Sequence, residues 1–163
     1  MSTTEKLNGY GPLAGVKVVE LCEWVAAPAC VRCLSEMGAT VIKVEPPYGD
    51  AQRTQGPGFG CEQTDMEDPT IDLNNTNKNF VSINLKNEEG MKFMKKLLAD
   101  ADIFVNNLRD KALNKMGLDY ETLHKEFPSL IWAQMRGYGE YGPEKDSPGF
   151  DAGCSWWRCK RFP

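Results

Sequence analysis

The sequence predicts an α/β protein with a Rossmann-like, open, mostly parallel sheet and flanking helices. Short segments rich in β-branched residues alternate with amphipathic helical segments along the 163 residues. The first strand, helix and second strand also follow one another within about thirty residues, which is the length of a βαβ unit in a parallel sheet. The expected order is therefore strand, helix, strand, long loop, strand, helix, strand, short helices and strand.

The first three elements are well delimited. Residues 16–21 and 40–44 are predicted strands, and residues 27–37 are a predicted helix with Pro28 in its first turn. A glycine directly after residue 37 supplies the helix stop. Residues 46–70 are rich in proline and glycine, so we expect a long loop there, and loops of that length are usually functional or mobile.

The second half of the chain continues the alternation. Asn87 can cap a helix whose first turn carries two glutamates and whose apolar residues recur at spacings of three and four. The remaining elements are expected as strands at residues 80–85, 103–105 and 130–135 and as short helices at residues 111–116 and 120–127.

Composition excludes several functional classes. The net charge of −4 argues against nucleic acid as a main partner. No apolar run is long enough to span a membrane, and the polar N-terminus lacks the apolar core of a signal peptide. We therefore expect a cytoplasmic protein without a membrane or nucleic-acid partner.

The cysteines and the single histidine do not predict a metal or nucleophilic site. Cys30 and Cys33 form a C-x-x-C pair, but a zinc site would need a second pair of ligands. His124 is remote from them and is expected on the surface. We expect small side chains packed on a helix here, with no metal.

Two further patterns concern phosphate binding. Residues 137–142 fit G-x-G-x-x-G, but Pro143 follows where the helix that would hold a pyrophosphate should begin, so NAD binding is not expected. Lys86, Arg109 and Lys115 lie just after predicted strands or in the helix that follows, near the strand ends where ligands of open α/β sheets collect. They could bind phosphates or be ordinary surface charges.

Six collinear segments form one pattern that covers residues 13 to about 151. They are residues 13–21, 26–29, 37–46, 75–86, 101–107 and 137–151. This pattern resembles CoA-transferase family III, the formyl-CoA transferase type. The last segment is similar to the branch that acts on 2-hydroxyacyl CoA esters in anaerobes, such as those of phenyllactate and 2-hydroxyisocaproate.

The resemblance implies a reaction and its partners. CoA would move between an acyl-CoA and a carboxylic acid, with the acid expected to be a 2-hydroxy acid, through an aspartyl-CoA thioester. Coenzyme A would be a substrate rather than a permanently bound cofactor, and full-length members are interlocked homodimers. The nucleophilic aspartate belongs to a later Gly-Asp motif, so no catalytic residue is expected in this chain, and the chain alone is expected to be inactive.

The resemblance also implies residues that contact CoA. Pro46 stands where the family often has an arginine after the second strand. The positions that match the family's CoA contacts are Val25, Ala26, Ile83, Asn84, Leu85, Lys86, Asn107, Leu108, Arg109, Lys115 and Asp151.

The expected organisation has three parts. Residues 1–12 would be a polar extension, residues 13–151 the N-terminal part of an incomplete CoA-transferase large domain, and residues 152–163 an atypical tail that fits a truncation or frameshift. The alternatives are a non-catalytic CoA- or nucleotide-binding module, an inactive gene fragment and an acyl-CoA racemase. Phe150 disfavours the racemase, because it stands where that branch has a histidine and phenylalanine has no acid-base chemistry.

Overall fold

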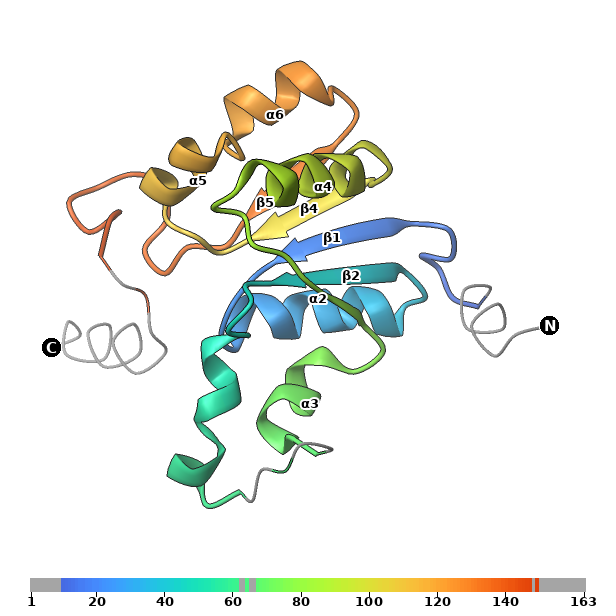
Figure 1. Cartoon of the computed structure of the whole chain (residues 1–163), viewed down its shortest axis with the longest axis vertical. Helices are drawn as coiled ribbons and strands as arrows, with labels where there is room; N and C mark the ends of the chain where they lie inside the picture. The colour runs from blue at the N-terminus through green and yellow to red at the C-terminus, as the bar shows by residue number, and fades with distance from the viewer. Residues whose placement is uncertain (1–9, 62–63, 65–66, 148, 150–163) are drawn as a thin grey trace, which may run out of the picture.

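A computed structural model describes residues 10–61, 64, 67–147 and 149, and it contains one five-stranded sheet (Figure 1). All four strand pairings are parallel, in the order β3-β2-β1-β4-β5. This arrangement confirms the predicted α/β fold class. The strands are β1 (Lys17–Leu21), β2 (Thr40–Glu45), β3 (Asn79–Ser82), β4 (Ile103–Asn106) and β5 (Ile131–Gln134).

Helices cover both faces of the sheet. In Figure 1, α4, α5 and α6 lie on one side, and α2 and α3 lie on the other. The two cores match these layers because side chains alternate between faces along each strand. Val19 and Phe104 belong to the core beneath α4, whereas Val18 and Val105 belong to the core beneath α2. The helices are α2 (Ala26–Glu36), α3 (Pro69–Asn75), α4 (Glu88–Ala99), α5 (Asp110–Met116) and α6 (Tyr120–Glu126).

Local signals for helix ends act as predicted. The side chain of Asn87 accepts a hydrogen bond from the Gly90 N–H at 2.7 Å and so caps α4. After α2, Gly38 adopts φ +100°, and a Cβ atom there would lie 2.4 Å from the Tyr10 carbonyl oxygen. Only glycine fits this combination of dihedral angle and close approach.

The long loop differs most from expectation. It contains two 3₁₀ turns, η1 (Ala51–Thr54) and η2 (Gly56–Phe59), and α3 begins inside it at Pro69. The Asp68 side chain caps α3 by accepting from the Thr70 and Ile71 amides. An aspartate followed by proline is a helix-start signal, and it was obscured by the surrounding glycines and prolines.

Several expectations fall on residues outside the described ranges. These include residues 1–9, Phe150, Asp151 and the tail at residues 152–163. The proposed domain boundaries stay a prediction. Within the described ranges, no helix combines the length and the apolar character that crossing a membrane requires.

Candidate functional site

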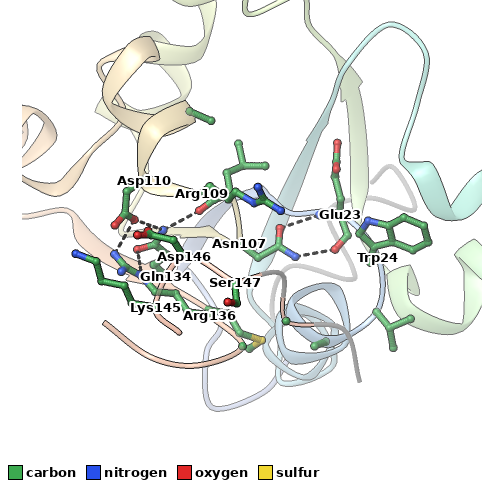
Figure 2. Close-up of a pocket in the computed structure, with 17 residues that line it drawn as sticks. Glu23, Trp24, Asn107, Arg109, Asp110, Gln134, Arg136, Lys145, Asp146 and Ser147 are labelled. Atoms are coloured by element: carbon green, nitrogen blue, oxygen red, sulfur yellow. Dashed lines mark hydrogen bonds and ion pairs between the residues drawn. The ribbon is translucent and has the colours of Figure 1, made fainter. Parts of the chain in front are cut away.

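A cavity of about 680 Å³ lies at the carboxyl edge of the sheet. The chain leaves β1 towards β2 and leaves β4 towards β5, on opposite sides, so the sheet has its topological switch point between β1 and β4. Ligands of open α/β sheets bind in the crevice at this point. The lining comes from the segments that follow β1, β4 and β5, namely residues 23–26, 107–110, 112, 134–137, 145–147 and 149 (Figure 2).

The segment after β1 is fastened to the segment after β4. The Glu23 N–H donates to Asn107 Oδ1 at 3.0 Å, and Asn107 Nδ2 donates to the Glu23 carbonyl at 2.7 Å. Figure 2 shows the Asn107 amide reaching the Glu23 backbone. Val25 and Ala26 follow at the start of α2, where no side chain caps the helix. The first-turn amides of a helix have no intrahelical acceptor and attract anions.

A polar cluster fixes an arginine on the other side of the cavity. Arg136, just after β5, donates to Gln134 Oε1 at 2.8 Å and pairs with Asp110 Oδ1 at 2.7 Å. Gln134 in turn donates to the Leu108 carbonyl at 2.7 Å and to Asp110 Oδ1 at 3.0 Å. Because each group is held by the others, the guanidinium of Arg136 is orientated before any ligand arrives.

The charges that line the cavity leave cations free to meet an anion. Arg109, Arg136 and Lys145 are the cationic residues. Among the described residues, neither Arg109 nor Lys145 forms an ion pair. Burial raises the pKa of the Glu23 carboxyl above its ordinary value, and the nearby Asp50 carboxylate adds to the effect. The cavity can therefore hold a phosphate or carboxylate group near Arg109.

The structure brings together some of the residues predicted to contact CoA. Val25, Ala26, Asn107, Leu108 and Arg109 all line the cavity.

The other predicted contacts lie elsewhere. Residues 83–86 follow β3, which is separated from β1 by β2. Ile83 is buried in the core beneath α4, Lys86 is exposed, and Lys115 is exposed in the last turn of α5. Contact of these residues with CoA stays a prediction, as does that of Asp151, which lies outside the described residues.

Sequence reasoning missed eight polar or aromatic residues of the lining. The rule that selected Arg109, a cation just after a strand, also applies to Arg136 after β5. The others depend on loop geometry that spacing does not reveal. The eight are Glu23, Trp24, Asp110, Gln134, Arg136, Lys145, Asp146 and Ser147.

The glycine-rich segment, the C-x-x-C pair and His124 were not expected to form sites. No helix begins among residues 137–147, as Pro143 led us to expect. Cys30 and Cys33 are exposed on α2, so the expectation that they pack into the protein is wrong, because they lie on the outward face of the helix. His124 is exposed as predicted and stacks on Tyr120 with ring centroids 5.2 Å apart. The described residues contain no group of three side chains suited to a metal ion.

Comparisons with known proteins agree on one family. The model for CoA-transferase family III matches residues 13–155. The chain is 51% identical over 139 residues to a (R)-2-hydroxy-4-methylpentanoate CoA-transferase of Clostridioides difficile. It is 49% identical over 144 residues to a cinnamoyl-CoA:phenyllactate CoA-transferase of Clostridium sporogenes. These matches cover 85% and 88% of this chain but 35% of each relative.

A solved structure shows the same fold. A CAIB/BAIF family protein from Brucella suis superposes with a TM-score of 0.81 at 37% identity. The superposition covers 88% of this chain and 38% of that one. Sequence and structure thus point to the same group of proteins, and the chain spans little more than a third of their length.

Proposed function

The chain belongs to CoA-transferase family III, and we propose that it binds coenzyme A in the cavity at the carboxyl edge of β1, β4 and β5. In this proposal it is the CoA-binding part of an enzyme that moves CoA between an acyl-CoA and a carboxylic acid. The two relatives near 50% identity are named for 2-hydroxy acids. Their names support an acid of that class as the acceptor.

The proposal is carried by the combination of a preformed cavity with two cations, Arg109 and Lys145, that form no ion pair within the described part of the chain. Its volume of about 680 Å³ is in the range of small-molecule sites. Coenzyme A carries a pyrophosphate and a 3′-phosphate. Arg109 and Lys145 can bind such groups through charge-assisted hydrogen bonds, and the first-turn amides of α2 offer further donors.

The proposed reaction runs through covalent catalysis by a carboxylate. An aspartate carboxylate attacks the acyl-CoA carbonyl, and the C–S bond breaks to give a mixed anhydride and CoA thiolate. The thiolate attacks the aspartyl carbonyl of the anhydride, which releases the acyl group as a carboxylate and leaves an aspartyl-CoA thioester. The incoming acid reverses these steps and leaves as its CoA ester.

The proposal assigns no nucleophile to these 163 residues. It therefore expects the isolated chain to bind CoA without catalysing transfer. The alternative of a CoA-binding module makes the same expectation for the chain alone, so the two differ in whether a longer protein with this segment transfers CoA. The homodimer and the cytoplasmic location remain predictions.

Isothermal titration of the chain with CoA tests the binding. Arg109→Ala should weaken binding by about tenfold or more, because one charge-assisted contact to a phosphate is lost. Lys92→Ala is a matched control, since Lys92 is exposed on α4 and lies outside this cavity. Equal affinities for the two variants would contradict the proposed site, and measurable CoA transfer by the chain alone would contradict the missing nucleophile.

The same titration tests whether Lys86 and Lys115, which lie outside the cavity, contact CoA. Lys86→Ala and Lys115→Ala should weaken CoA binding if the residues contact its phosphates. Both side chains are exposed, so neither substitution should alter the folded state. Unchanged affinity would remove the residue concerned from the site.

A further inference from the structure

A buried network of four charged side chains lies next to the cavity, at the carboxyl ends of β1 and β2. Its members are Glu20, Lys43, Asp50 and Lys78, and all four side chains are fully buried. Lys43 Nζ lies 3.3 Å from Glu20 Oε1 and 3.0 Å from Asp50 Oδ2, and Lys78 Nζ lies 2.8 Å from Glu20 Oε2. Two carboxylates and two ammonium groups therefore balance one another inside the protein.

Asp50 connects this network to the cavity wall. Its Oδ2 atom pairs with Lys43, whereas its Oδ1 atom accepts from the Trp24 amide at 3.1 Å and from the Gln52 amide at 2.9 Å. The carboxylate thus bridges the loop after β2 and the loop after β1. Lys43 also donates to the Cys22 carbonyl at 2.7 Å, so it fixes the chain two residues before Trp24.

The amide that donates to Asp50 belongs to a strained residue. Trp24 has φ +68°, the left-handed region that side chains other than glycine and asparagine rarely adopt. A strained residue persists only where its surroundings determine the conformation. Here the amide of Trp24 is held by Asp50 and the neighbouring Glu23 is held by Asn107.

We propose that Asp50 is a positioning residue for the ligand cavity. Through the Trp24 amide it holds the loop after β1 in the conformation that lets Trp24, Val25 and Ala26 line the cavity. Lys43 keeps the Asp50 carboxylate in place from the opposite side. This inference rests on the proposed function, because it assigns the loop to the binding of CoA.

If Asp50 positions the loop after β1, its replacements should differ in how much they lower the affinity for CoA. Asp50→Asn and Asp50→Ala remove the same charge, but only asparagine keeps an oxygen that can accept from Trp24. Without this acceptor, the left-handed conformation of Trp24 loses the support that Asp50 gives it, and the binding-competent loop becomes less populated. The measured affinity for CoA then falls in proportion to the fraction of molecules whose loop is in the binding-competent conformation. We expect Asp50→Ala to weaken CoA binding about tenfold. Asp50→Asn should weaken it less, because its oxygen can still accept from Trp24 although its NH2 group then faces the Lys43 ammonium.

The test measures CoA affinity by titration and stability by urea unfolding for both variants. Asp72→Ala on α3, an exposed carboxylate, is the control and should change neither. If Asp50 only stabilised the fold, the CoA affinity of each variant would depend on its free energy of unfolding alone. Alanine and asparagine variants of equal stability would then bind CoA equally. That result overturns the inference, whereas weaker binding by the alanine variant than by the asparagine variant supports it.

A second pair keeps the test usable if Asp50→Ala does not fold. Adding Lys43→Met to each variant leaves the Glu20–Lys78 pair balanced and removes the ammonium that would face an asparagine NH2 group. K43M/D50A and K43M/D50N then differ in the side-chain acceptor for the Trp24 and Gln52 amides. The alanine form should again bind CoA about tenfold more weakly, and equal binding overturns the inference. If the original chain binds no CoA, the proposed function fails and the role of Asp50 fails with it. Binding by the original chain and by both alanine forms alike overturns the inference alone.

Discussion

Replacing Lys43 with methionine should destabilise the chain more than the small change in side-chain volume suggests. Methionine fills a similar volume but leaves the Glu20 and Asp50 carboxylates facing one ammonium group in the interior. At Lys43, burial favours the neutral amine, but the two carboxylates outweigh it and hold the pKa above its ordinary value. The ammonium is therefore charged at neutral pH, and its removal breaks real ion pairs.

The expected loss follows from the burial of the network. Removing one partner of a fully buried ion pair lowers the free energy of unfolding by about 3–5 kcal/mol, since a charge is left uncompensated. With a urea dependence near 2 kcal/mol per molar, the unfolding midpoint should fall by roughly 2 M. A loss of this size is a large part of the stability of an ordinary domain.

Two further variants make the measurement decisive. Lys92→Met removes an ion pair with Glu89 whose side chains are 64% and 85% exposed, and it should change stability by less than about 0.5 kcal/mol. K43M/D50N restores the charge balance and should be more stable than Lys43→Met, despite carrying more substitutions. The reasoning is refuted if Lys43→Met behaves like Lys92→Met, or if the double variant is no more stable than the single one.

Two other predictions concern the thiols and a helix cap. Iodoacetamide at about pH 8 should label Cys30 and Cys33 in the folded chain, because both are exposed. Cys22 should react only on unfolding, since burial raises its pKa well above the ordinary value, and its labelling in the folded chain would contradict the buried position. Asn87→Ala should lower the free energy of unfolding by about 1 kcal/mol in urea, whereas Asn87→Ser, which keeps a capping oxygen, should preserve most of it. Equal losses for these two variants would show that the cap does not stabilise α4.

The sequence predicts the alternation of strands and helices well because each element carries its own local signal. Asn87 and Gly38 mark helix ends by chemistry that acts within a few residues. The α3 helix was not predicted, because the residue that caps its start, Asp68, lies in a region dominated by turn-forming residues. Element boundaries thus follow from local sequence wherever neighbouring signals agree.

The site was harder to predict for a physical reason. Arg109 could be selected because ligands gather where strands end, and Val25 could be selected because it matches a family position. The partnership of Lys43 with Asp50 and Trp24 depends on how two loops meet after the strands have paired. Lysine in the middle of an apolar strand is a signal of a buried partner, but the sequence does not say which carboxylate it meets.

The cavity has a consequence for the order of events during folding. Its walls come from segments after β1, β4 and β5, of which the first and the last are more than a hundred residues apart in the chain. Contacts between such distant segments form late, because the entropy of closing the intervening loop must be overcome first. A chain synthesised only through α5 would carry Asn107, whose amide holds the segment after β1, but would lack Arg136. Among the strand pairings, that of β1 with β4 joins the segments farthest apart in the chain. Competence to bind is therefore acquired when these two strands dock, and ligand binding reports that the two halves of this sheet have joined.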